Sequence, residues 1–252
     1  MSKRPHTDTA ATSKPLVVIT GATSGIGARV AQDFSAAGHP LLLLGRRQER
    51  MEQLGLPNAL CEKVDVCDAG AVRAAVDKAE AKFGPVGCLV NNAGVMLLGS
   101  VASQDPSEWT QMLQVNIGGV LNGISAVLKG MQERKAGHLI NISSIAGIKL
   151  FPNHAVYCAT KFAVHALTEG LRQECAGLGV RVTVISPGAV ETELLSHTTD
   201  QSIKDGYGKW KESMTEGVLQ AEDVSQAVLF AYNMPKRCCV RDIQLAPTNQ
   251  EP

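Results

Sequence analysis

Short apolar runs alternate with longer amphipathic segments along most of the chain. The apolar runs are six or seven residues long and lie at 15–20, 40–45, 60–66, 87–92, 138–143, 180–186 and 241–246. The segments with helical periodicity lie near 25–37, 47–54, 69–83, 107–132, 153–178 and 221–232. Most of the runs are apolar throughout rather than alternating with polar residues, which predicts strands buried on both faces, as in a parallel sheet.

This order of elements predicts an α/β fold, a Rossmann-type doubly wound sandwich with a mostly parallel seven-stranded sheet and helices on both faces. No linker or change of composition divides the chain, so we expect residues 15–252 to form a single domain. Residues 1–14 are polar and lack the apolar stretch of a secretory signal, so we expect a disordered leader, with a mitochondrial presequence as the alternative.

Charge and cysteine content narrow the class of protein. The chain has 24 basic and 24 acidic residues and no long run of either sign, so we expect neither nucleic acid nor a membrane surface as a partner. No apolar run approaches the roughly 18 residues that span a bilayer. Seven cysteines without C-x-x-C spacing argue against a disulfide framework or a zinc site, so we expect a cytoplasmic protein without a metal.

A glycine-rich turn, TGATSGIG at 20–27, follows the first strand and opens the first helix. Gly21 permits a tight turn, Gly25 lets the backbone approach a pyrophosphate, and Gly27 allows close packing of helix and strand. The free N–H groups at the helix N-terminus then attract phosphate. This pattern predicts a dinucleotide-binding site.

The end of the second strand indicates which dinucleotide is bound. A site for NAD usually has an acidic residue there, which binds the ribose 2′-hydroxyl, whereas arginine suits a 2′-phosphate. This strand ends in Gly45-Arg46-Arg47, and the first carboxylate is Glu49. Two arginines can offer charge-assisted hydrogen bonds to phosphate. The sequence therefore favours NADP(H) over NAD(H), the alternative being two solvated arginines at a helix start.

One tyrosine stands in a reactive context. Each of the three tyrosines has a lysine four residues later, but only Tyr157 also has a hydroxyl residue, Ser144, thirteen positions upstream. The positions of Tyr157 and Lys161 lie one helical turn apart and face the same side. A nearby ammonium is expected to lower the pKa of the phenol from about 10. Ser144 is placed to hydrogen-bond a carbonyl oxygen that gains negative charge.

Together with NNAG (91–94), Asn116 and YCATK (157–161), these motifs resemble the short-chain dehydrogenase/reductase family, in its compact branch of about 250 residues. The resemblance implies a catalytic tetrad of Asn116, Ser144, Tyr157 and Lys161, in which Asn116 holds a water that resupplies protons. Ser143 is the alternative hydroxyl, but the spacing favours Ser144. The cofactor contacts implied are Gly21, Thr23, Ser24, Gly25, Ile26, Gly27, Arg46, Arg47, Asp65, Val66, Asn92, Ala93, Gly94, Tyr157, Lys161, Pro187, Gly188, Val190 and Thr192.

The implied activity is NADP(H)-dependent reduction of a carbonyl to an alcohol, or the reverse, with Tyr157 as the acid or base. The resemblance further implies a substrate lid at about 189–220. Its composition does not name the substrate, which we expect to be a ketone, an aldehyde or a 3-oxo or 3-hydroxy acid derivative. A carboxylate would need a partner such as Lys204, Lys209 or Lys211.

Some alternatives stay open at this point. A non-catalytic NADP(H)-binding sensor is the alternative function, and dehydration or epimerisation the alternative chemistry. The helices at 107–132 and 153–178 resemble those that pair subunits in the family, which implies a homotetramer, or else a dimer. His154 and His197 flank the expected site and are candidates for substrate contact, whereas we expect Cys158 to be a small core residue.

Overall fold

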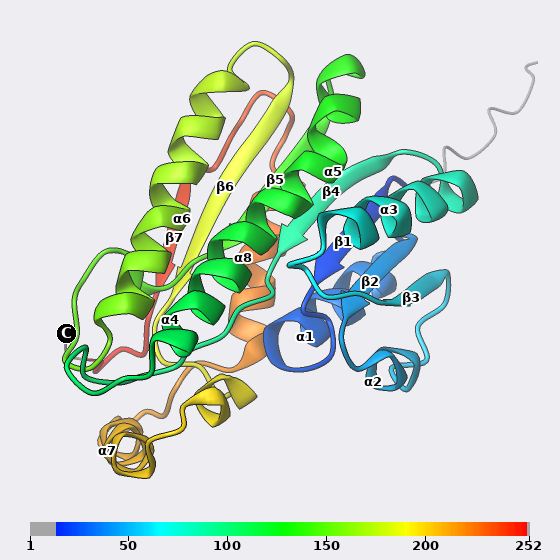
Figure 1. The fold of residues 1–252 in the computed structure, drawn as a ribbon. Helices are drawn as coiled ribbons and strands as arrows, with labels where there is room; N and C mark the ends of the chain where they lie inside the picture. The colour runs from blue at the N-terminus through cyan, green and yellow to red at the C-terminus, as the bar shows by residue number, and fades with distance from the viewer. Residues whose placement is uncertain (1–13, 251–252) are drawn as a thin grey trace, which may run out of the picture.

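A parallel sheet forms the centre of the structure, a computed structural model that describes residues 14–250 (Figure 1). Its seven strands are β1 (Leu16–Thr20), β2 (Leu41–Gly45), β3 (Ala59–Lys63), β4 (Val86–Asn91), β5 (Gly137–Ile142), β6 (Val180–Pro187) and β7 (Asp242–Leu245). They lie in the order β3-β2-β1-β4-β5-β6-β7, and every neighbouring pair is parallel. The predicted seven-stranded Rossmann-type sandwich is confirmed.

Helices cover both faces of the sheet, as Figure 1 shows. One face packs on α1 (Gly25–Ala36), α2 (Gln48–Glu52) and α8 (Ala221–Asn233), and the other on α3 (Ala69–Phe83), α5 (Gly119–Glu133) and α6 (Ala155–Glu174). Successive residues of a strand point to opposite faces. Leu16 and Val18 therefore join the core under α3 and α5, whereas Val17 and Ile19 join the core under α1 and α8. Burial on both faces explains why the strands lack polar alternation.

The long helix predicted at about 107–132 is present as an unbroken helical path, but a π-helical turn interrupts its regular geometry. The structure has α4 (Pro106–Leu113), then a π-helical turn at Gln114–Gly118, then α5. A π-turn adds one residue to a helical turn, and the apolar spacing on either side of it still fits an ordinary helix. The sequence pattern therefore did not predict the turn. Beyond it, Gly119 lies against Val66, whose Cγ2 would be 2.7 Å from a Cβ placed on this glycine.

The segment 189–220, predicted to form a lid and called the lid below, contains a short 3₁₀ helix at Glu193–His197 and the helix α7 (Gln201–Glu212). Figure 1 shows α7, in gold, beyond the ends of the strands. The strand order reverses between β1 and β4, and crevices for ligands form outside the carboxyl ends of strands at such a switch point. The lid and the switch point together frame the candidate site.

The expected leader at 1–14 lies outside the described residues apart from Lys14, and so do residues 251–252 of the expected domain. Between residues 14 and 250, no helix has the length and apolar character needed to cross a membrane. In the same range, no group of three or more His, Cys, Asp or Glu side chains is arranged to hold a metal ion.

Candidate active site

The glycine turn is locked against the segment that follows β4. The Thr20 hydroxyl accepts hydrogen bonds of 3.0 Å from the backbone N–H groups of both Asn92 and Ala93. The Asn92 side-chain amide donates to the carbonyl oxygens of Thr20 and Gly21 at 3.0 and 3.1 Å. A Cβ on Gly27 would lie 2.5 Å from Asn92 Nδ2, so no larger residue fits there without movement. Two segments far apart in the chain therefore form one rigid cradle.

The cradle fits a pyrophosphate. Gly21 and Gly25 have φ values of 66° and 52°, which lie in the left-handed region that favours glycine. Ser24 occupies the N-cap of α1, but its side chain makes no capping hydrogen bond, so the first N–H groups of α1 keep their capacity to bind an anion. The residues around the turn are therefore compatible with the phosphates of a dinucleotide.

Two arginines stand beside the cradle. Arg46 and Arg47 both line the cavity, and Nη2 of Arg47 donates to the hydroxyls of Thr23 and Ser24 at 3.0 and 3.3 Å. Gly45, which ends β2, has no room for a side chain, because an added Cβ would collide with Cγ2 of Thr23. A side chain at the end of β2 would therefore require Thr23 to move, and the sequence places no carboxylate there.

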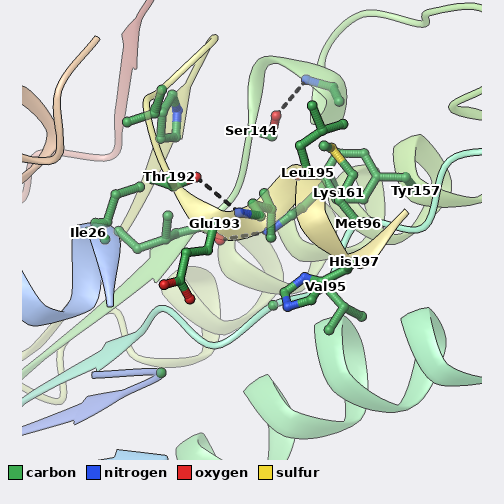
Figure 2. A pocket seen from close by; sticks show the side chains of 18 of the residues that line it. Ile26, Val95, Met96, Ser144, Tyr157, Lys161, Thr192, Glu193, Leu195 and His197 are labelled. Carbon is green, nitrogen blue, oxygen red and sulfur yellow. Dashed lines mark hydrogen bonds between the residues drawn. The ribbon is translucent and has the colours of Figure 1, made fainter. Parts of the chain in front are cut away.

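Three members of the predicted tetrad meet at the other end of the same cavity, which measures about 740 Å³. Tyr157 and Lys161 project from α6, and Ser144 follows β5 (Figure 2). Nζ of Lys161 donates to the carbonyl oxygen of Ile142 at 3.1 Å and lies 5.9 Å from the Tyr157 ring centroid. The neighbouring Ser143 donates its hydroxyl to the carbonyl oxygen of Lys161 at 3.2 Å, so it is already engaged within the protein.

Burial controls the titration of this pair. It raises the pKa of the Tyr157 phenol above its ordinary value, and Ser144 opposes the shift only in part. Burial also lowers the pKa of Lys161 to about 8. The expected lowering of the Tyr157 pKa by Lys161 is therefore wrong for the protein by itself, because loss of solvent around the phenol outweighs the influence of neighbouring groups.

Asn116 lies behind the cavity rather than in its wall. It is buried within the π-helical turn, where its Oδ1 accepts from the Val95 N–H at 2.8 Å. Its Nδ2 donates to the carbonyl oxygen of Val95 at 2.9 Å and to the Thr160 hydroxyl at 3.1 Å. Asn116 thus ties the segment after β4 to α6, which carries Tyr157 and Lys161.

The start of the lid closes over the cradle. Pro187, Gly188, Val190 and Thr192 line the cavity. A Cβ placed on Gly25 would lie 3.1 Å from Cγ2 of Thr192, so this threonine rests directly on the glycine turn. Figure 2 shows Thr192 and Glu193 near Ile26 of α1, with Tyr157 and Met96 towards the opposite end of the cavity.

The end of the cavity beyond Tyr157 is largely apolar and aromatic. Its wall includes Met96, Val115, Phe151, Leu195, Tyr207 and Trp210. Ring centroids are separated by 6.2 Å for His154 and Tyr207 and by 5.1 Å for Tyr207 and Trp210. Burial lowers the pKa of His154, which favours its neutral form. Aromatic side chains therefore dominate the part of the cavity beyond Tyr157.

Of the three lysines considered as partners of a carboxylate, one lines the cavity, and it is held in an ion pair. Lys204 and Lys209 do not line the cavity. Lys211 does, but its Nζ already pairs with Glu191 Oε2 at 2.5 Å.

Comparison with known proteins places this geometry in a family. The family model for short chain dehydrogenases matches residues 15–203. An uncharacterized oxidoreductase of Staphylococcus saprophyticus is 40% identical over 241 residues, which cover 93% of this chain and 96% of the relative. The chain belongs to the short-chain dehydrogenase/reductase family, a family of oxidoreductases.

Two solved dehydrogenases share the fold over most of the chain. The closed form of a serine dehydrogenase complexed with NADP+ has a TM-score of 0.86 and 33% identity, covering 94% of this chain and 96% of that one. An alcohol dehydrogenase of the archaeon Thermococcus sibiricus, complexed with 5-hydroxy-NADP, has a TM-score of 0.81 and 26% identity and covers 94% and 98% of the two chains. The bound nucleotides in both are of the NADP type.

Most of the residues that the family resemblance implied lie around one cavity. Two of them, Gly27 and Asn116, stand behind its wall and act through packing and hydrogen bonds. Cys158 is buried, as expected for a core residue. Sequence reasoning missed Gln250, whose Oε1 accepts from the Ala189 N–H at 2.8 Å and so holds the start of the lid.

Proposed function

We propose that the protein is an NADP(H)-dependent oxidoreductase that reduces an uncharged ketone or aldehyde to an alcohol, or catalyses the reverse reaction. The observation that carries this proposal is the convergence of Tyr157, Lys161 and Ser144 on a cavity whose opposite end holds the glycine turn and two arginines. A dinucleotide held by these residues would supply or accept the hydride.

Tyr157 supplies the proton in the reductive direction. The phenol is protonated at neutral pH even at its ordinary pKa, and burial, which raises that pKa, makes it a weaker acid in the protein by itself. Proton donation therefore depends on a cation that stabilises the phenolate. As hydride reaches the carbonyl carbon, the carbonyl oxygen gains negative charge and takes the proton from Tyr157. The Ser144 hydroxyl donates a hydrogen bond to the same oxygen and stabilises that charge. For alcohol oxidation the transfers run in reverse, with the phenolate as base.

Lys161 supports Tyr157 after the proton has left. The phenolate then formed would be unfavourable in a buried site without a cation. With a pKa of about 8, Lys161 is mostly protonated at pH 7 and supplies that cation from the same helix. Its anchor on the Ile142 carbonyl oxygen sets the position of the ammonium.

NADP(H) is favoured over NAD(H) by packing and charge at the end of β2. The absence of space for a side chain on Gly45 removes the usual partner of a ribose 2′-hydroxyl. Arg46 and Arg47 offer a 2′-phosphate charge-assisted hydrogen bonds instead. The NADP-type nucleotides of the serine and alcohol dehydrogenases support the same preference.

An uncharged substrate is favoured over a 3-oxo or 3-hydroxy acid. A carboxylate buried beyond Tyr157 would lose its hydration without gaining a free cation, because Lys211 is paired with Glu191. Aromatic and aliphatic walls instead suit a ketone or aldehyde with an apolar substituent.

We propose that the protein assembles as a homotetramer, or else a dimer, in the cytoplasm. The support for this assembly is apolar exposure on the two long helices: Leu121 on α5 is 45% exposed and Phe162 on α6 is 41% exposed. Light scattering of the purified protein measures the assembly directly.

The proposed activity is tested directly by measuring the loss of NADPH or NADH absorbance when purified protein is mixed with a panel of ketones, aldehydes and 3-oxo acids. We expect turnover with NADPH that greatly exceeds turnover with NADH. Stronger turnover with NADH would refute the assignment of the 2′-phosphate site. Tight NADPH binding without turnover across the panel would refute the enzymatic function and favour a sensor.

A further inference from the structure

Glu193 connects the lid to the nucleotide end of the cavity. Its Oε2 accepts a hydrogen bond of 3.0 Å from Nη2 of Arg47, and its Oε1 accepts one of 2.8 Å from Nη1 of Arg50. These two ion pairs join the first turn of the lid's 3₁₀ helix to the segment after β2. The preceding residue, Thr192, rests on Gly25, so two consecutive lid residues contact the nucleotide cradle.

The same nitrogen of Arg47 serves both the cradle and the lid. Nη2 donates to Thr23 and Ser24 within the glycine turn and to Glu193 in the lid. Arg47 also lines the cavity, where the proposed function assigns it to the 2′-phosphate. A doubly charged phosphate and the Glu193 carboxylate would repel each other if both stayed beside this guanidinium. The two anions therefore compete for one cation.

Arg50 gives Glu193 a second partner when Arg47 is withdrawn. It pairs with the other oxygen of the carboxylate and does not line the cavity. Glu193 thus remains paired with Arg50 after Arg47 turns to another anion, so the exchange leaves no carboxylate without a partner. The pairs are about half exposed, so the exchange takes place in contact with solvent and involves modest energies.

We propose that Glu193 is a specificity-determining residue of the lid: it competes with the 2′-phosphate of the cofactor for Arg47. The inference rests on the proposed function, since it presumes that Arg47 binds this phosphate. Glu193 then weakens binding of nucleotides that carry the phosphate and leaves binding of those without it unchanged. Through the same exchange, a bound 2′-phosphate loosens one of the two ion pairs that hold the start of the lid.

The test uses two probes without nicotinamide, adenosine 2′,5′-bisphosphate and adenosine 5′-monophosphate, titrated calorimetrically into the complete protein. We expect Glu193→Gln to bind the bisphosphate about two- to tenfold more tightly than the unaltered protein. Binding of the monophosphate is expected to stay the same. The matched control is Glu212→Gln, because Glu212 is an exposed lid carboxylate that neither lines the cavity nor pairs with Arg47. It is expected to change neither affinity.

A second variant separates exchange at Arg47 from a general effect of negative charge. In an Arg47→Gln background, Glu193→Gln is expected to give no further gain, because the shared partner has been removed. A gain that persists without Arg47, or no gain in Glu193→Gln alone, overturns the inference and leaves the proposed function standing. If the unaltered protein binds both probes equally well, the 2′-phosphate assignment itself fails, and the inference fails with it.

Discussion

The ammonium of Lys161 is anchored to the carbonyl oxygen of Ile142, 3.1 Å away at the end of β5, rather than to an acidic side chain. Its side chain is buried, and burial lowers its pKa to about 8. A charged group kept in such surroundings reduces the stability of the fold. The candidate site therefore holds a cation that lowers the stability of the protein. The proposed reaction requires that cation.

Replacing Lys161 with methionine is expected to stabilise the protein at pH 7 by about 1 to 3 kcal/mol while abolishing turnover. A lysine whose folded pKa is lowered from 10.5 to about 8 carries its full penalty below pH 8. The penalty shrinks as the pH rises from 8 towards 10.5, because the folded protein then releases this proton while the unfolded chain still holds it. The gain from Lys161→Met should consequently shrink by pH 10, which urea unfolding at the two pH values measures.

Lys129→Met is the control for this experiment, since the Lys129 side chain is 88% exposed. It should show no comparable gain at either pH. A Lys161→Met variant that is less stable than the unaltered protein at pH 7 would mean that the ammonium contributes more to packing and hydrogen bonding than its burial takes away.

Tyr157→Phe is expected to lower carbonyl reduction by a factor of about 10² to 10⁴ while leaving the dissociation constant for NADPH within a few-fold. The change removes one hydroxyl from a ring that is otherwise packed in the apolar cluster beneath the lid. Tyr232→Phe is the matched control, because Tyr232 packs against Phe34 and His39, far along the chain from the tetrad. Reduction that survives Tyr157→Phe unchanged would exclude this phenol as the proton donor.

One glycine-to-alanine substitution tests the packing of the cradle, and a second, in a helix outside the cradle, serves as its comparison. Gly27→Ala places a methyl group 2.5 Å from Asn92 Nδ2, so we expect a loss of about 1 to 3 kcal/mol in unfolding free energy and weaker NADPH binding. Gly170→Ala lies within α6, and no atom stands within 4 Å of the added methyl group. It should stabilise the protein by about 0.5 to 1 kcal/mol. Chemical unfolding compares the two directly, and equal effects would contradict the packing of Asn92 on the turn.

The fold was predictable because its strands are buried on both faces. Runs such as 41–44, four consecutive leucines, are explained by helices on either side of β2. The glycine turn was predictable for a related reason, since Gly21 and Gly25 take positive φ values in a tight turn between a strand and a helix, which is a local need. Local rules of this kind need no knowledge of distant segments.

Other features depend on contacts that no local pattern encodes. Arg47 and Glu193 are 146 residues apart, and exposed arginines and glutamates are common, so nothing in the sequence pairs these two. The π-helical turn around Asn116 was missed because apolar spacing on either side fits an ordinary helix. The pKa of Tyr157 was misjudged because the sequence shows a lysine nearby but not the depth at which the phenol is buried.

The aromatic wall beyond Tyr157 leads to the last prediction, which concerns substrate charge. Phe151, Tyr207 and Trp210 line this end of the cavity, and Lys211 is held by Glu191. We therefore expect 4-phenylbutan-2-one to be reduced with a kcat/KM at least tenfold above that of the same ketone bearing a para-carboxylate. The missing cation leaves the carboxylate desolvated without compensation, a loss of at least about 1.4 kcal/mol.

Trp210→Ala should lower kcat/KM for the phenyl ketone about ten- to a hundredfold and affect a small aldehyde such as propanal much less, because only the larger substrate reaches the wall. Glu191→Gln provides the converse variant. Freeing Lys211 from its ion pair should improve reduction of the carboxylated ketone while leaving the neutral one unchanged. If the carboxylated ketone is already the better substrate of the unaltered protein, the lysine pairs with substrate rather than with Glu191, and the site selects acids after all.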